Sequence, residues 1–448
     1  MSLHVASEMQ WLHSVLPQIL RSGRLLDNYE ETQLSSFKVL SIDVEPIGID
    51  EAYMMTLCYR ASIRFEYAGQ LALKKMIVKK SPVLPPDMYN KLQFDVMFYN
   101  EISFYTEILP MIQQLAQGNF AAPKYYHSER QAQAALIVLE DFGTAGWRIT
   151  EDRYGLSLEH AVIAVKYLGK FHGFGYAIKQ QQPQRFALLC SKLKESRFNR
   201  SELPAAWQLK HEAIHKRMLQ SVFKHQPQLD KKFIEHFYVL TSDYLSYGRQ
   251  RVAPREPLAT LCHGDYLRNN VAYKYNELGE PLDIMMFDYQ TMRLCSPMVD
   301  LCVFLSLSIL ADVRYAHFDA LFDAYGDALF ASYKQHAQQS LPAYLNRETL
   351  LKEYVRHLPY AITIASFFLA EMVEPRKEAL EELVSDMTDQ QIIEQAMTKG
   401  GELVDQEVAH QLKELYELCQ KHHVHIADDI DMSTWADKAL NDYCYLIK

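Results

Sequence analysis

The chain has 448 residues, of which 49% are hydrophobic and 23% are charged, a balance that excludes a disordered chain and fits two or three packed units. The formal net charge is −10 and no basic stripe stands out, which argues against a protein that grips nucleic acid. The seven cysteines form no CxxC pair, which suits reduced thiols. The N-terminus lacks the basic start and unbroken apolar stretch of a secretory signal, and the apolar runs are too short to span a bilayer. We therefore expect a soluble, cytoplasmic protein.

Residues 1–30 are predicted to form an amphipathic helical extension. Their apolar side chains recur at the spacing of one face of an α-helix. The positions that follow this spacing are Met9, Leu12, Val15, Leu16 and Ile19.

Residues 31–140 are predicted to form a small β-rich lobe. Segments rich in β-branched and aromatic residues, with turn residues between them, predict strands, and a helical pattern separates the last strand from the others. The strands are expected at 37–47, 54–67, 71–79 and 134–140, and the helix at 87–115.

From residue 141 to residue 448 helical patterns dominate, interrupted by one strand-like island. The chain is therefore predicted to have an α+β fold with two lobes, a small β-rich N-lobe and a large, mainly helical C-lobe that holds the acceptor site. A crevice between two lobes is a common place for a ligand. The helices are expected at 157–178, 207–248, 298–337, 348–374 and 376–423, and the strand-like island at 258–290.

The island contains the sequence His263-Gly264-Asp265, with Asn270 five positions after the aspartate. An apolar strand enters this segment and a second strand leaves it, so the carboxylate and the amide lie on one tight loop. Both residue types also favour turns, and capping a turn is the alternative interpretation of this loop alone.

A hairpin turn at 276–279 sends the chain back along a third strand, which ends in Asp288. A hairpin returns its end to its beginning, so we expect Asp288 beside the Asp265 loop. Phosphoryl transfer requires a carboxylate that orients the attacking hydroxyl, and Asp265 supplies one. It also requires hard oxygen ligands for Mg²⁺, and Asn270 and Asp288 supply those.

The strand at 71–79 offers a cation for phosphates. By alternation, Lys79 shares a face with Leu71, Leu73 and Ile77, whereas Lys80 lies on the other face. A solvated strand end with several lysines is the alternative.

The helix that follows supports the functional interpretation of Lys79. Glu101 falls within the apolar stripe of this helix, and a buried carboxylate needs a partner because an unpaired buried charge is costly. We therefore predict a Lys79–Glu101 ion pair. The alternative is a rotated helix with an exposed Glu101.

These residues resemble the ecdysteroid-kinase-like proteins of insects, within the choline-kinase and aminoglycoside-phosphotransferase branch of protein-kinase-like folds. The resemblance runs in order and spacing over roughly residues 40–380. The segments that carry it are IVKK (77–80), FYNEISFYTEILP (98–110), VLEDFG (138–143), CHGDYLRNN (262–270), FDYQ (287–290) and DLCVFL (300–305).

The resemblance implies a role for each residue of the site, with ATP and Mg²⁺ as cofactors. Asp265 is implied to be the catalytic base, and Asn270 and Asp288 the magnesium ligands. Lys79 is implied to hold the α- and β-phosphates, oriented by Glu101.

The same resemblance assigns the segment around Glu140, Asp141 and Phe142 as the hinge, against which adenine lies through backbone hydrogen bonds. Asp300 is implied to anchor the catalytic loop, and His263 to pack and form hydrogen bonds rather than act as an acid or base. His172 reads as a core histidine that braces this loop.

One departure from the family concerns the loop that covers the phosphates. Here the corresponding segment, 47–56, has a single glycine, Gly48, and Met55 stands where the family often has a small polar residue. Backbone amides of this loop, including that of Gly48, remain candidate phosphate contacts. No GxxxxGK[ST] motif occurs in the chain.

The predicted function is that of an ATP-dependent small-molecule kinase whose acceptor is a lipophilic alcohol such as an ecdysteroid. The alternatives are a choline- or ethanolamine-type kinase and a catalytically degenerate kinase-like binding protein. The acidic stretch 371–386 would suit a cationic acceptor but reads as an exposed helix face. Phe367 and Phe368 lie on a helix that could form the wall of a sterol pocket.

Overall fold

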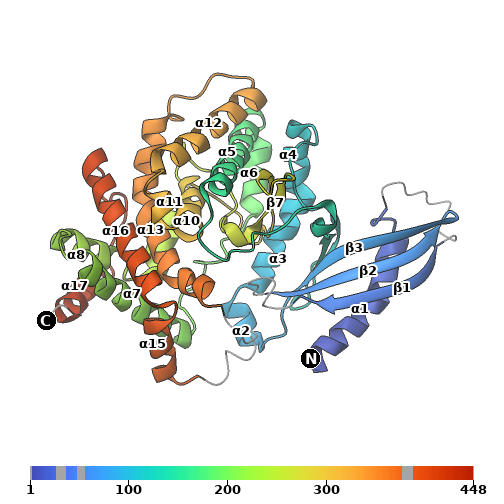
Figure 1. Cartoon of the computed structure of the whole chain (residues 1–448), viewed down its shortest axis with the longest axis horizontal. Helices are drawn as coiled ribbons and strands as arrows, with labels where there is room; N and C mark the ends of the chain where they lie inside the picture. Colours follow the sequence, from blue (N-terminus) through green and yellow to red (C-terminus); the bar gives the residue numbers. More distant parts are fainter. Residues whose placement is uncertain (1–2, 27–36, 48–55, 376–386, 447–448) are drawn as a thin grey trace.

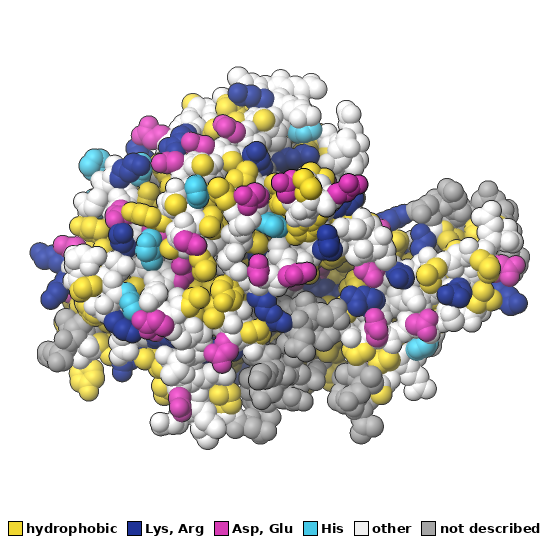
Figure 2. Space-filling view, viewed as in Figure 1, with side chains coloured by type: hydrophobic (Ala, Val, Ile, Leu, Met, Phe, Trp, Pro, Cys, Tyr) yellow, Lys and Arg dark blue, Asp and Glu magenta, His cyan; other side chains and the backbone are white. Residues whose placement is uncertain are grey.

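The computed structural model describes residues 3–26, 37–47, 56–375 and 387–446. Figure 1 shows a small lobe built on a twisted sheet at one end of the molecule and a larger helical lobe at the other. The predicted two-lobed α+β architecture is therefore confirmed. On the face shown in Figure 2, basic and acidic side chains are interspersed.

The small lobe contains a five-stranded antiparallel sheet with the order β1-β2-β3-β5-β4. The hairpin between β2 and β3 turns at Ala68 and Gly69, both with positive φ, as the tight turns of twisted hairpins require. β4 was not predicted, because it is short and polar. The strands are β1 (Lys38–Pro46), β2 (Leu57–Tyr67), β3 (Gln70–Lys80), β4 (Tyr125–Glu129) and β5 (Leu136–Glu140).

The predicted N-terminal helix is present as α1 (Leu3–Arg21) and packs against the small lobe's sheet (Figure 1). Its buried apolar side chains form one cluster with those of β2, β3 and β5, so the helix is part of this lobe's core rather than an appendage. The helix members of this cluster are Leu12, Leu16, Ile19 and Leu20.

The segment predicted as a single helix over 87–115 divides into several pieces. Gln93, with φ 62°, separates the helix at 86–91 from the helix at 94–103. A π-helical turn at 104–108 then precedes the last helix, at 109–116. The side-chain amide of Asn100 donates to the backbone carbonyls of Lys194 and Gln290, which ties this region to the helical lobe. The pieces are α2 (Pro86–Lys91), α3 (Phe94–Ser103), the π turn (Phe104–Ile108) and α4 (Leu109–Ala116).

Within the described residues the predicted helical segments of the large lobe are present, but several are divided. Residues 376–386 of the segment expected at 376–423 lie outside the described residues. The region expected as one helix over 207–248 becomes three, because Asp230 and Asp243 each accept a hydrogen bond from the first turn of a new helix. The helices are α5 (Leu158–Gln181), α6 (Pro183–Lys192), α7 (Ala205–His225), α8 (Lys231–Thr241), α9 (Tyr244–Val252), α10 (Met298–Ser308), α11 (Ala311–Arg314), α12 (Phe318–Ala337), α13 (Arg347–Val373), α15 (Asp389–Thr398), α16 (Gly401–His422) and α17 (Ala436–Leu446).

The strand-like island forms two small antiparallel sheets on the large lobe. β6 (Thr260–Cys262) pairs with β9 (Arg293–Cys295), and β7 (Val271–Tyr275) pairs with β8 (Pro281–Met286). The predicted β7–β8 hairpin is confirmed, whereas β9 is too short to have been recognised. None of the described helices is both long and apolar enough to cross a membrane.

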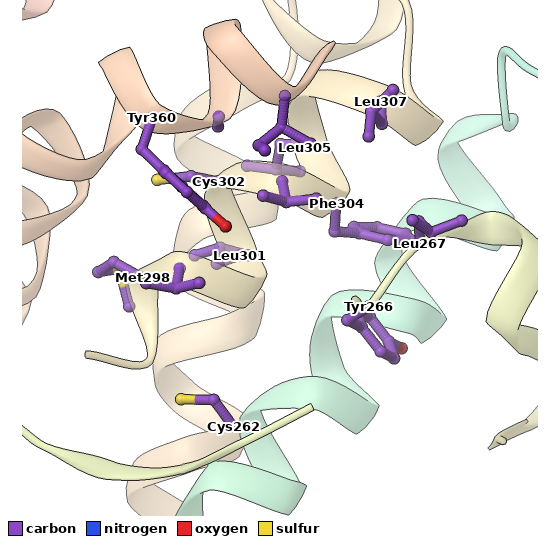
Figure 3. Packing of buried hydrophobic residues seen from close by; sticks show 14 of the residues in the cluster. Cys262, Tyr266, Leu267, Met298, Leu301, Cys302, Phe304, Leu305, Leu307 and Tyr360 are labelled. Atoms are coloured by element: carbon purple, nitrogen blue, oxygen red, sulfur yellow. The ribbon is translucent and has the colours of Figure 1, made fainter. Parts of the chain in front are cut away.

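Helix α10 lies at the centre of the large lobe, and each of its residues is buried. In Figure 3 the side chains of Tyr266 and Leu267, which follow the HGD segment, face this helix. The ring centroids of Tyr266 and Phe304 are 5.1 Å apart. The loop that carries Asp265 therefore rests on a helix whose residues are all buried.

Candidate active site

The Asp265 loop is held from below by a buried carboxylate. Asp300, near the start of α10, accepts hydrogen bonds from the backbone N–H groups of His263 and Gly264, each over 2.7 Å. His172 on α5 lies 3.1 Å from the same carboxylate. Burial alone would favour the neutral acid, but the bonds from His172 and the backbone hold the pKa of Asp300 below its ordinary value. The expected anchoring by Asp300 and bracing by His172 are confirmed.

We expect Asp300→Asn to destabilise the folded protein by about 1–3 kcal/mol, because an amide retains the shape but offers one acceptor where two N–H donors need partners. Denaturant unfolding of the two proteins measures this difference. Asp312→Asn, at an exposed position just beyond α10, is the control. Equal midpoints for wild type and Asp300→Asn would show that the loop does not depend on this anchor.

Glycine is required in the loop for a steric reason. Gly264 has φ +82°, and a Cβ built there would lie 2.1 Å from the carbonyl oxygen of Thr291.

The ring of His263 is buried, and its Nε2 lies 3.0 Å from the carbonyl oxygen of Phe287. His263 thus links the loop to the end of β8, as expected of a packing residue.

Asp265 and Asn270 are joined directly. The side-chain amide nitrogen of Asn270 donates to the backbone carbonyl of Asp265 over 2.8 Å and to its carboxylate over 3.1 Å. Because the nitrogen is occupied in this way, the amide oxygen of Asn270 is the atom available to a metal ion.

Asp288 lies where the hairpin was predicted to bring it. The backbone N–H of Phe287 donates to the carbonyl of Asn270 over 3.0 Å, which fixes the end of β8 beside the loop. Asp288 itself has φ 66°, a conformation that is rare for a residue with a side chain and that often marks functional sites.

Lys79 bridges the two lobes. Its ammonium group lies 2.6 Å from the Glu101 carboxylate on α3 and 2.5 Å from that of Asp288. Burial opposes the charge, yet Asp288 and Glu101 raise the pKa of Lys79 above its ordinary value. Burial raises the pKa of Glu101 to about 7, with Lys79 acting in the opposite direction. The predicted Lys79–Glu101 ion pair is present.

The reasoning that selected Lys79 was wrong about its face of the strand. Leu71 and Leu73, on the same face, are 74% and 48% exposed, whereas Met76 and Val78 on the opposite face are fully buried. The apolar cover lies beneath α1 on that opposite face, so the face that Lys79 shares with Leu71 and Leu73 is not the buried apolar one, although Lys79 does form the predicted ion pair.

Lys80, on the face covered by α1, is buried as well. Its ammonium group pairs with Glu8 and lies 4.1 Å from the ring centroid of Trp11. The N-terminal helix α1 thus supplies the partners of Lys80, the second lysine at this end of β3.

The predicted hinge joins β5 to the large lobe, but its hydrogen-bonding groups are largely occupied. The N–H groups of Glu140 and Asp141 donate to the carbonyls of Lys124 and Lys75. The Asp141 carboxylate caps the short 3₁₀ turn that follows. Gly48, the candidate phosphate contact in the loop, lies outside the described residues.

Phe142 contributes an apolar surface at the hinge. Its ring centroid lies 5.0 Å from that of Phe287, the residue before Asp288. The two rings belong to a small cluster with Trp147, Ala272 and Met285. Phe142 therefore lies close to the Asp288 end of the site, although none of the three hinge residues lines the cavity described next.

A cavity of about 130 Å³ opens beside the loop and has two chemically different ends. One end carries Asp265, Asn270 and Asp288 together. The remaining lining is mostly aromatic and aliphatic and comes from α3, α7, α9, α10, α13 and the residue after α2, with Leu92, Met97, Trp207, His211, Tyr244, Leu307, Phe367, Phe368 and Met372 among its residues.

The aromatic end is built around His211. Its ring stacks on Tyr244 with centroids 4.1 Å apart and on Phe367 with centroids 4.5 Å apart. Burial lowers the pKa of His211 to about 3, so the ring is neutral near pH 7. His211 and Tyr244 also line a second, larger cavity of about 1050 Å³. The helix of Phe367 and Phe368 does form a wall of the cavity, as considered above.

Glu371 is not on an exposed face, contrary to the interpretation of the acidic stretch. Its side chain is buried at the cavity edge, where the ammonium groups of Lys210 and Lys399 lie 2.7 Å and 2.6 Å away. The burial of Glu371 follows from the packing of its helix against α7 and not from the charged residues that follow it in the sequence. Residues 376–386 of that stretch lie outside the described residues.

Sequence reasoning missed two arginines. Arg197 and Arg200 lie between α6 and α7 and line the cavity, and the guanidinium group of Arg197 donates to Asp265 over 2.9 Å. Neither residue belongs to a recognisable motif or a periodic element, so no sequence signal distinguished them from the other arginines.

His172, Cys262 and Asp300 form the one His/Cys/Asp/Glu group within the described residues whose ligand atoms lie within 4.8 Å of one another. Hydrogen bonds account for these atoms. His172 lies 2.8 Å from the hydroxyl of Tyr325, and the thiol of Cys262 donates to backbone carbonyls. We therefore interpret this group as the structural support of the loop.

A family model described as the ecdysteroid kinase-like family matches residues 50–337. No curated protein matches the chain significantly. The chain is similar to two solved phosphotransferases. One is an AMP-bound complex of spectinomycin phosphotransferase APH(9)-Ia, with 12% identity, coverage of 75% of this chain and 90% of that chain, and a TM-score of 0.33. The other is an aminoglycoside-3'-phosphotransferase of type VIII, with 15% identity, coverage of 69% and 93%, and a TM-score of 0.29.

Proposed function

Because the chain belongs to the ecdysteroid kinase-like family, we propose that it is a small-molecule kinase that transfers the γ-phosphoryl group of ATP to a hydroxyl of a lipophilic alcohol. The observation that carries this proposal is the convergence of Asp265, Asn270 and Asp288 on one cavity at the junction of the lobes. Lys79 reaches the same point from the small lobe through its contact with Asp288.

The donor set fits a magnesium ion. Asp288 offers a carboxylate and Asn270 an amide oxygen, and Mg²⁺ prefers such hard oxygen ligands together with phosphate oxygens and water. When bound, the ion would neutralise charge on the nucleotide phosphates. Asn270 and Asp288 would hold the ion, and the Asp300 anchor keeps the loop of Asp265 and Asn270 in place.

The nucleotide is assigned to the small lobe, residues 31–140, with the hinge at Glu140 to Phe142. Lys79 binds phosphate oxygens, and Glu101 keeps its ammonium group directed to the lobe junction. Since the N–H groups of Glu140 and Asp141 already have partners, the adenine base would contact the remaining backbone groups of the hinge and the apolar surface of Phe142.

Asp265 orients the acceptor hydroxyl and accepts its proton. The carboxylate lies on the cavity surface, so a hydroxyl entering from the aromatic end meets it directly. In the transfer step the hydroxyl oxygen forms a bond to the terminal phosphorus, the bond from phosphorus to the bridging oxygen breaks, ADP leaves and the proton passes to Asp265.

The cavity walls favour a lipophilic acceptor over a choline-like cation. Trp207, Phe367 and Phe368 present apolar surface. The acidic residue at that end, Glu371, already pairs with two lysines, so it is not an open counter-ion for a quaternary ammonium group. The free space is smaller than the roughly 300–1000 Å³ of typical ligand pockets, so a sterol-sized acceptor requires the aromatic side chains to move.

The proposal is tested by incubating the protein with ATP and Mg²⁺ and a panel of acceptors, followed by mass spectrometry. We expect a product with one added phosphate from ecdysteroids or other sterols and none from choline or ethanolamine. Phosphorylated choline with unmodified sterols would support the choline-type alternative. Stabilisation by Mg²⁺ and ATP without any product across sterols, amino alcohols and a metabolite extract would support a degenerate binding protein.

A further inference from the structure

The catalytic mechanism proposed above does not use two basic residues of the cavity. Arg197 and Arg200 line it, and one edge of the Arg197 guanidinium group contacts Asp265. The other terminal nitrogen of Arg197, Nη1, and two nitrogens of Arg200, Nε and Nη1, are buried without a hydrogen-bond partner. A buried donor without a partner is costly, and in a native protein it points to a bound ligand, ion or water.

The charges around this cavity are unbalanced in favour of a bound anion. Each acidic residue that lines it has a basic partner: Asp265 has Arg197, Asp288 has Lys79, and Glu371 has two lysines. Within the part of the chain that the structure describes, Arg200 forms no ion pair. Burial lowers the pKa of Arg200 from its ordinary value, with Arg197 acting in the same direction and Tyr244 and Glu195 in the opposite one.

The other cations near the site are engaged elsewhere. Arg268, on the Asp265 loop itself, donates to the carbonyls of Thr150 and Arg153 and to the Thr150 hydroxyl, and is turned away from the cavity. Lys79 is held between two carboxylates on the small-lobe side. Among the described residues that line the cavity, the uncompensated positive charge is therefore that of Arg200, and both arginines supply free N–H donors.

We propose that Arg197 and Arg200 form an anion subsite that holds the terminal phosphoryl group of the nucleotide while it passes to the acceptor. This inference rests on the kinase function proposed above. The free N–H groups would donate to phosphoryl oxygens, where negative charge must be compensated during transfer. The contact between Arg197 and Asp265 places this subsite next to the base that receives the hydroxyl proton.

The test compares binding of two nucleotides by isothermal titration calorimetry in the presence of Mg²⁺. One is ADP, and the other is AMP-PNP, which retains a terminal phosphoryl group but is not turned over. We expect the wild-type protein to prefer AMP-PNP by about tenfold or more, since charge-assisted hydrogen bonds to the extra phosphoryl group contribute this much. Arg200→Gln and Arg197→Gln should each lower this preference about tenfold, with ADP affinity within about twofold of wild type.

Two further variants separate binding from folding. Arg200→Lys retains the charge and should retain part of the preference for AMP-PNP. Arg185→Gln changes an exposed arginine on the neighbouring helix α6 and should bind both nucleotides as the wild type does. An unchanged preference in both glutamine variants overturns the subsite. The same holds if they lose affinity only for the acceptor, since the anion would then belong to the acceptor. A wild-type protein that binds neither nucleotide would instead overturn the kinase function itself.

Discussion

Asp265→Asn is expected to lower the rate of phosphate transfer by about 10²–10⁴-fold, the usual contribution of a positioned general base. Nucleotide affinity should change little, because the contacts proposed for the nucleotide come from Lys79, Asn270, Asp288 and the two arginines of the anion subsite rather than from Asp265. Steady-state kinetics with a responsive acceptor, combined with calorimetry of nucleotide binding, measures both quantities.

The matched control is Asp283→Asn, an exposed aspartate on β8 of the neighbouring hairpin. It makes the same chemical change without touching the cavity, so its kinetics should equal those of the wild type. Full activity in Asp265→Asn would remove Asp265 from the mechanism. A joint loss of activity and nucleotide binding would mean that it acts mainly by holding Asn270.

Lys79→Met should be the most destabilising single change at the lobe junction. It leaves the Glu101 and Asp288 carboxylates close together without the ammonium group that separates them, and the side chain of Glu101 is only 1% exposed. Breaking a buried ion pair by removing one partner costs about 3–5 kcal/mol. Denaturant unfolding measures this cost, and nucleotide affinity should fall as well because the proposed phosphate contact is lost.

Two further variants serve as controls for Lys79→Met. Lys75→Met changes an exposed lysine of the same strand and should leave stability within about 0.5 kcal/mol of wild type. Adding Glu101→Gln to Lys79→Met removes one unpaired carboxylate and should restore part of the stability. If the double variant is no more stable than Lys79→Met, the buried charge of Glu101 is not the source of the loss.

The chemistry-bearing loop was predictable because its parts are near one another in the chain. Asp265 and Asn270 share a single loop, and a short hairpin brings Asp288 back beside it. Local turn geometry then decides the arrangement without knowledge of the rest of the fold. Burial of Glu101 in its helix was likewise visible from helical spacing, and it pointed to a cation partner.

Other features depend on packing between distant segments, which periodicity does not encode. Alternation along β3 could not show that α1 covers the face of Lys80, so the face of Lys79 was misjudged. Arg197 and Arg200 reach the cavity from an irregular segment. Glu371 is buried because its helix packs against α7, where Lys210 of α7 and Lys399 from the turn after α15 pair with it.

The most direct test of the central claim is a crystal structure of the protein with Mg²⁺ and AMP-PNP. The proposed site predicts a metal ion bound by the Asn270 amide oxygen and the Asp288 carboxylate at about 2.0–2.1 Å, with the terminal phosphate facing Asp265. A nucleotide bound away from this loop, or a metal ion that touches neither residue, would contradict the assignment.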